Sequence, residues 1–208
     1  MKSAFEPANK GITYPAEILT PAEVAQLFRS CSNRAPTGIR NRALITVLYR
    51  AGLRISEALA LKPKDVSRDA GTIRVLHGKG DRARVTGIDP ASFAAIDRWL
   101  DKRKELGLTG RSPLFCTLQG EPIQPSYVRH WMKRLATKAG IEKRVHAHGL
   151  RHSHAAELAS ERHPINVIQA QLGHSSLATT SRYLAHIQPQ QLVDAMKGRP
   201  PWEPEGRA

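Results

Sequence analysis

Apolar residues recur at the three- and four-residue spacing of an amphipathic helix through most of the chain. The first stripe, Val24, Leu27 and Phe28, follows the segment 20–23. There a capping threonine, a proline at the first helical position and an early glutamate favour a helix start. Further stripes predict helices over residues 40–51, 56–61, 93–106, 128–139, 150–159, 164–172, 176–187 and 192–196.

The period changes between residues 72 and 88. Residues 72–76 alternate polar and apolar, residues 77–81 are rich in glycine, and residues 83–88 alternate again. Two short strands around a glycine-rich turn are typical of a β-hairpin. The predicted fold class is therefore mostly α with a small antiparallel β-hairpin or sheet, an α+β fold.

The length of 208 residues and a hydrophobic content of 40% are those of one ordinary domain with a sizeable core. We expect a tail or arm over residues 1–19, the domain over 20–197, and a mobile proline-containing tail over 198–208. No internal repeat is visible in the sequence.

The charge balance narrows the class of partner. Lys and Arg number 32 against 18 Asp and Glu, a formal net charge of +14. Such an excess favours a polyanion, with nucleic acid the first candidate and an anionic membrane the second. No apolar run approaches the roughly 20 residues that a spanning helix needs, so we expect no membrane insertion. The cysteines, Cys31 and Cys116, are expected to be free thiols in a reducing compartment.

Two arginines and a histidine suggest a site for an anion. Arg54 follows a predicted helix end beside a glycine, where its planar guanidinium could hold two phosphate oxygens. His148 and Arg151 are three residues apart and would share a helix face. Taken singly, each has a plainer interpretation: a surface or salt-bridging Arg54, and a half-buried His148 at a helix start.

Three further residues add reactive groups. Lys79 lies at the predicted hairpin tip, where it could donate a proton or simply be solvated. His174 follows a Leu-Gly pair, and Tyr183 lies nine residues later on a predicted helix. A packed aromatic is the commonest fate of such a tyrosine. Together, two Arg, two His, one Lys and one Tyr make the set needed for phosphoryl transfer onto a phenol.

The order and spacing of these residues resemble the catalytic domain of the tyrosine recombinases, the phage integrase family, over about residues 18–190. The family signature runs Arg, Lys on a hairpin, HxxR, LGH and Tyr, and it is matched by the catalytic set Arg54, Lys79, His148, Arg151, His174 and Tyr183. Glu57 matches the family's acidic position and is expected to orient Arg54 or a neighbour.

The resemblance implies a site-specific recombinase or integrase. The tyrosine would attack a DNA phosphodiester, leave a 3′-phosphotyrosyl link and a free 5′-hydroxyl, and exchange strands through a Holliday junction. Arg54 and Arg151 would stabilise the phosphate charge, His148 or His174 would add hydrogen bonds, and Lys79 would protonate the leaving oxygen. No ATP, metal or other cofactor is expected.

Neighbouring histidines leave the histidine assignment open. His146 and His152 compete with His148, which the three-residue step to Arg151 favours. The cluster of His146, His148, His152 and His154 could also suggest a metal. Its spacing has neither a zinc-finger nor an HExxH form, so we expect none.

DNA contacts are expected beyond the reacting phosphate. Basic residues of the 126–138 helix fall at four-residue steps away from its apolar stripe, although a merely solvated face has the same spacing. The expected double-stranded DNA contacts are Arg129, Lys133, Arg134, Lys138, Arg82 and Arg84.

The resemblance also implies a dimer to tetramer on DNA, with a monomer possible in the free state, in bacterial cytoplasm with a nucleoid, plasmid or phage. Family members usually carry a helical core-binding domain first. Here about 20 residues precede the matched region, so we expect a truncated chain or a naturally minimal recombinase. The alternatives are a type IB topoisomerase-like enzyme and a non-cutting DNA-binding regulator.

Overall fold

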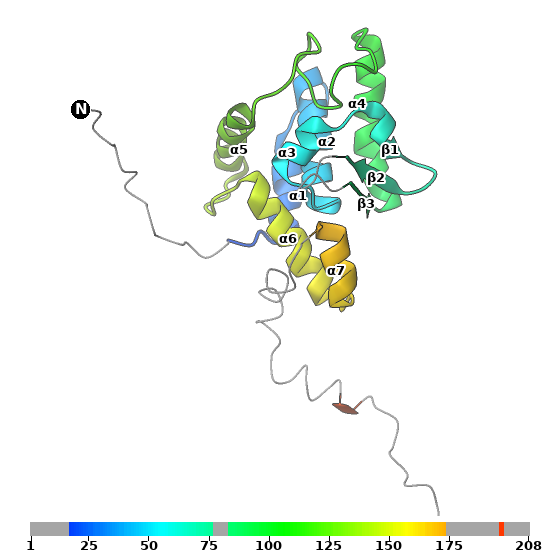
Figure 1. Ribbon diagram of the computed structural model, residues 1–208. Helices are drawn as coiled ribbons and strands as arrows, with labels where there is room; N and C mark the ends of the chain where they lie inside the picture. The colour runs from blue at the N-terminus through cyan, green and yellow to red at the C-terminus, as the bar shows by residue number, and fades with distance from the viewer. Residues whose placement is uncertain (1–16, 77–82, 174–195, 198–208) are drawn as a thin grey trace, which may run out of the picture.

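The computed structural model describes residues 17–76, 83–173 and 196–197. Helices dominate these ranges, together with two short 3-10 helices, η1 (Pro63–Asp65) and η2 (Pro90–Ser92), and one three-stranded antiparallel sheet (Figure 1). This architecture confirms the predicted fold class. The helices are α1 (Pro21–Ser30), α2 (Pro36–Arg50), α3 (Ile55–Ala60), α4 (Phe93–Glu105), α5 (Pro125–Ala139), α6 (Ala147–Ser160) and α7 (Ile165–Leu172).

Helix α2 is the centre of the core. Its side chains are buried on nearly every face, as in a helix surrounded by protein. Helices α4 and α6 pack against it, and α1 packs against α5. The sequence placed the start at residue 40, but the helix begins at Pro36. A proline is favoured at the first helical position, and the apolar stripe begins only later.

The start predicted for α1 is confirmed. The Thr20 hydroxyl accepts from the Glu23 N–H at 3.2 Å, and the Glu23 carboxylate accepts from the Thr20 N–H at 2.7 Å. This reciprocal pair satisfies two backbone donors that a helix start leaves open. The preceding Leu19 is only 2% exposed, and its N–H donates to the Ser153 hydroxyl, so the ordered core extends one residue before the cap.

The sheet has the order β1 (Val66–Ser67), β2 (Thr72–Val75), β3 (Arg84–Gly87). Strand β1, only two residues long, was not predicted. In β3 the polar residues face inward: Thr86 is 1% exposed and Arg84 is half-buried, whereas Val85 is 61% exposed. The inward placement is possible because Thr86 donates its hydroxyl to the Ala51 carbonyl and Arg84 pairs with an acid.

Helices α6 and α7 lie together at one end of the molecule, where α7 also packs on β3 (Figure 1). Both ends of α6 extend beyond the predicted 150–159, and its early start places His148 in the first turn. No described helix has the length and apolar character to cross a membrane. The helices predicted at 176–187 and 192–196, Met196 apart, lie outside the described residues.

Candidate functional site

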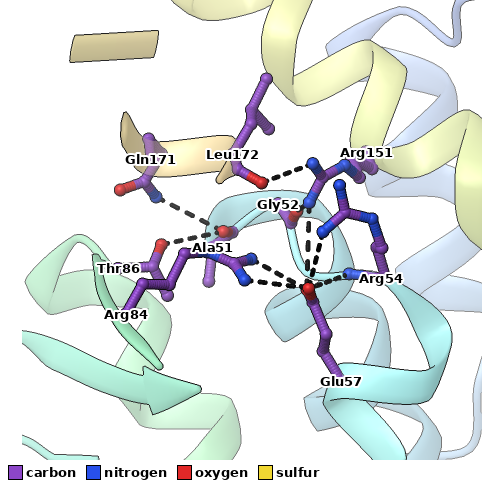
Figure 2. Close-up of polar contacts among 9 residues, drawn as sticks. All are labelled: Ala51, Gly52, Arg54, Glu57, Arg84, Thr86, Arg151, Gln171 and Leu172. Atoms are coloured by element: carbon purple, nitrogen blue, oxygen red, sulfur yellow. Dashed lines mark hydrogen bonds and ion pairs between the residues drawn. The ribbon is translucent and has the colours of Figure 1, made fainter. Parts of the chain in front are cut away.

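The carboxylate of Glu57 is the centre of a cluster of three guanidinium groups (Figure 2). One oxygen accepts from Arg54 Nη1 at 2.7 Å and from Arg84 Nη1 at 2.9 Å. The other accepts from the Arg54 backbone N–H at 2.9 Å and from Arg84 Nη2 at 2.8 Å. Arg151 Nη1 lies 3.9 Å from this second oxygen.

Local sequence explains how Arg54 and Glu57 meet. Arg54 is the N-cap of α3, and Glu57 is the third helical residue, so its side chain reaches back to the cap N–H. The prediction placed Arg54 just past the end of α2, which agrees with the loop between α2 and α3. The Arg54 side chain is 26% exposed, against 2% for Glu57. Arg54 is therefore a cation at the edge of the cluster, accessible from solvent.

Glu57 is held in its ionised form. Burial raises its pKa, but hydrogen bonds from Arg84 and from the Arg54 backbone and side chain outweigh burial and bring the pKa to about 2. A carboxylate has about four lone-pair sites, and all four are used here. Glu57 is thus unsuited to proton transfer and suited to holding arginines, the supporting role expected from the sequence.

Arg151 lies beneath the cluster and is 1% exposed. Its Nη1 donates to the Gly52 carbonyl at 2.6 Å, and its Nη2 donates to the Leu172 carbonyl. These bonds join the end of α2 to the end of α7 through α6. The structure therefore brings Arg54 and Glu57, which share one segment of the chain, together with Arg151 of α6.

The histidines at the start of α6 differ in their contacts. His146 is the N-cap, and its Nδ1 accepts from the Gly149 N–H at 2.9 Å, which gives it a structural role. His148 is exposed, and its ring meets the ring of His152 edge to face with centroids 4.2 Å apart. Partial burial, and then the charges of Arg151, His146 and Arg54, lower the pKa of His148. The lowered pKa favours the neutral imidazole, which keeps one N–H that could donate to a phosphate.

Four predicted site residues lie outside the described residues: Lys79, Arg82, His174 and Tyr183. The described range 83–173 ends at Gly173, directly before His174. The segment that holds Lys79 and Arg82 joins β2 to β3.

The basic face expected on α5 is present. Arg129, Lys133, Arg134 and Lys138 are all exposed, opposite a buried stripe that includes Val128 and Trp131. Lys138 also donates to the carbonyl of Ser30 at the end of α1.

Two contacts of this site were not predicted. Arg84 was expected to contact DNA, yet its guanidinium is directed at Glu57, and its side chain is 14% exposed. Its place on the inward face of β3, in step with Thr86 and Ile88, is the signal that could have indicated a buried partner. Gln171 bonds both backbone groups of Gly87, a contact without a sequence signal.

Within the described ranges, no group of three or more His, Cys, Asp or Glu could hold a metal.

Comparison with known proteins gives one consistent result. The phage integrase family profile matches residues 17–190. The tyrosine recombinase XerC of Xanthomonas axonopodis pv. citri (strain 306) is 38% identical over 159 residues, which is 76% of this chain and 50% of that protein. The chain spans about half the length of the curated relatives that it matches first.

Solved structures agree with the sequence match. The XerA recombinase superimposes with a TM-score of 0.75 at 29% identity, over 94% of this chain and 70% of that one. The XerH site-specific recombinase, bound to its difH substrate in a pre-cleavage complex, gives a TM-score of 0.73 at 32% identity, over 90% of this chain and 56% of that one. With the family profile covering most of its length, the chain belongs to the phage integrase family and has the fold of a tyrosine recombinase catalytic domain.

Proposed function

We propose that this chain is the DNA-cutting part of a site-specific recombinase and that Tyr183 is its nucleophile. The observation that carries the proposal is the convergence of Arg54 and Arg151 on the Glu57 carboxylate, which concentrates positive charge beside His148. The family match and the similarity to recombinases support the same function.

The proposed reaction replaces one phosphate ester with another. The phenol passes its proton to water and its oxygen attacks phosphorus. The bond from phosphorus to the 5′-oxygen breaks, and Lys79 gives that oxygen a proton. The product is a 3′-phosphotyrosyl link and a free 5′-hydroxyl. A partner strand's 5′-hydroxyl then reverses the step, so the bond energy is conserved and no ATP is needed.

The arginines would act on charge that develops at the phosphate. A phenol has a pKa of about 10 and is a poor nucleophile at neutral pH without nearby positive charge. Arg54 is the more accessible arginine, so we assign it the direct contact, with Arg151 adding charge beneath it. Removing one such preorganised donor typically raises a barrier by about 2.7–4 kcal/mol. His148 and His174 would donate further hydrogen bonds.

Double-stranded DNA is the proposed substrate and partner. The net charge of +14 and the exposed basic face of α5 support it. We propose that Arg129, Lys133, Arg134, Lys138 and Arg82 contact phosphates, and that the chain forms a dimer to tetramer on DNA in the bacterial cytoplasm. Strand exchange needs at least two active sites, which is the reason for proposing an assembly.

A pool of nicked duplexes with randomised sequence around the nick tests the proposal. The nick releases a short fragment after cleavage, so the covalent adduct is trapped and appears on a denaturing gel. We expect an adduct in EDTA, its loss in Tyr183→Phe, and enrichment of one sequence family among the trapped duplexes.

Three outcomes would contradict this function. An adduct without sequence enrichment, with relaxation of any supercoiled plasmid, would indicate a type IB topoisomerase. Tight binding to an enriched sequence without any adduct would indicate a non-cutting regulator. An adduct that persists in Tyr183→Phe would assign the nucleophile to another residue.

A further inference from the structure

Arg84 makes two side-chain hydrogen bonds to Glu57, more than either of the other two arginines. Both of its terminal nitrogens bind Glu57 side by side, at 2.9 and 2.8 Å, one on each carboxylate oxygen. This parallel arrangement is the strongest form of an arginine–carboxylate pair. With 14% of its side chain exposed, Arg84 presents little surface to DNA.

The end of α7 is fitted against the same side chain. A Cβ atom at Gly173 would lie 2.6 Å from Arg84 Nε and 2.7 Å from Arg84 Cδ, closer than real Cβ contacts. Gly173 also has a φ of +63°, where glycine is favoured. Only a glycine at this position lets the chain pass directly over Arg84, and His174 is the next residue.

A second contact fixes α7 to the strand that carries Arg84. The Gln171 side-chain oxygen accepts from the Gly87 N–H at 2.9 Å, and its nitrogen donates to the Gly87 carbonyl at 2.8 Å. Arg84 therefore lies where three segments meet: the start of α3 with Arg54, the end of α7 before His174, and the strand that follows the Lys79 segment.

We propose that Arg84 is a positioning residue of the DNA-cleavage reaction: it holds Glu57 in the geometry that places Arg54 and seats the chain that leads into His174. The inference rests on the proposed function. It replaces, for Arg84, the phosphate contact expected from the sequence.

The physical reason is that Glu57 accepts hydrogen bonds from both Arg54 and Arg84. Arg54 gives Glu57 one side-chain nitrogen, Nη1, and its backbone N–H. Without Arg84, the buried carboxylate would lose two of its four hydrogen bonds. Arg54 is then the nearest cation that could replace them. A guanidinium turned fully onto Glu57 is turned away from a phosphate.

The test compares Arg84→Gln with a matched control, Arg74→Gln, in the full chain. Arg74 is on the neighbouring strand β2 and pairs with Asp65 at 3.3 Å, but it is exposed and lies outside the cluster. Adduct formation is measured in a single turnover at saturating protein, on a nicked duplex recovered from the randomised pool. DNA binding is measured separately at several salt concentrations.

We expect Arg84→Gln to slow adduct formation by about 10- to 100-fold, by analogy with the loss of residues that orient the ligands of a metal ion. The Kd and its salt dependence should stay close to the wild type, as should both properties of Arg74→Gln. A phosphate contact would instead weaken binding and lower the salt slope by about 0.9. That second result would overturn the proposal.

A pH profile separates positioning from a loss of folding. Among the residues that the structure describes, the charged groups facing Glu57 are Arg54 at the start of α3, Arg84 from β3 and Arg151 from α6. Burial raises the pKa of Glu57 and the hydrogen bonds from Arg84 lower it, so the pKa should rise when Arg84 is removed. Adduct formation by Arg84→Gln should then fall with decreasing pH at values where the wild type is unaffected. Adding Glu57→Gln should remove this extra dependence.

Arg84→Lys keeps the charge but replaces the planar fork with one ammonium group. It is expected to fold and to react at a rate between those of the wild type and Arg84→Gln. Wild-type rates in both Arg84 variants would overturn the proposal while leaving the proposed function intact. A wild-type chain that forms no adduct would overturn both.

Discussion

At the scale of single residues, His154 is the least satisfied group in the described core. It is 4% exposed, and neither ring nitrogen has a hydrogen-bond partner among the described contacts. Its ring lies against Gly52, where a Cβ would approach its Cδ2 to 2.6 Å. Burial, followed by the charges of Arg50 and Arg151, lowers its pKa to about 4. His154 therefore remains neutral in the folded protein.

The first prediction concerns acid stability. An unfolded His154 takes up a proton near pH 6.5, whereas the folded one does so only near pH 4. Between these two values the unfolded state binds the proton and the folded state does not. The free energy of unfolding therefore falls by about 3 kcal/mol as the pH falls from 6.5 to 4. We expect His154→Phe to remove this part of the pH dependence in urea unfolding between pH 4 and 7. Exposed His163, replaced by Gln, is the control for the removal of an imidazole at the surface.

The second prediction concerns Gly173. The Cβ added by Gly173→Ala would clash with Arg84 atoms that Glu57 holds in place. The alanine would also have to adopt a left-handed backbone conformation. We expect loss of adduct formation and a lower Tm. Gly140→Ala is the matched control: its φ is +66° and nothing lies within 4 Å, so it tests backbone strain alone, about 1–2 kcal/mol. Equal effects of the two variants would contradict the steric account.

At the scale of elements, the described helices could be predicted because each carries apolar residues at helical spacing and a recognisable start or end. Boundaries shifted where the signal was a proline or a cap rather than an apolar residue, as at Pro36 of α2 and at His146, the cap of α6. The two-residue strand β1 is too short to show a period. Strand β3 reverses the usual pattern because its inward polar groups have specific partners.

The third prediction concerns α5. Arg129→Gln combined with Lys133→Gln should weaken DNA binding and lower the slope of log K against log salt by about 1.8, since each phosphate contact contributes about 0.9. Fluorescence anisotropy at several salt concentrations measures both. Lys104→Gln on α4 removes an equally exposed lysine that is paired with Asp101, and it serves as the control. An unchanged slope in the double variant would identify α5 as a solvated face.

At the scale of the whole molecule, the site is made of segments far apart in the chain. Spacing within a segment could be predicted: Arg54 with Glu57, and His148 with Arg151. The contacts of Arg84 with Glu57, and of Arg151 with Gly52 and Leu172, could not be predicted. They depend on how α6 packs on α2 and how α7 packs on β3. For Arg54, Glu57 and Arg151, which the structure describes, the family signature indicated a shared site without giving their contacts.

The fourth prediction concerns the cluster as a unit. Arg151→Gln removes a buried charge and two bonds to carbonyl groups, those of Gly52 and Leu172. Leaving such carbonyls without a donor costs about 1–3 kcal/mol each. We expect a lower free energy of unfolding together with loss of adduct formation. Arg54→Gln, at an accessible position, should abolish the adduct with a smaller change in stability. The comparison uses urea unfolding and the denaturing gel.

The amide of Gln171 has a consequence for self-association. Strand β3 is at the edge of the described sheet, and at Gly87 the amide occupies both the N–H and the carbonyl that a further strand would use. Open strand edges are templates for pairing between copies of a protein. Through Gln171, helix α7 therefore covers part of an edge that could otherwise pair with another copy of the chain. We expect a chain that ends before Gln171 to aggregate by strand pairing at this edge.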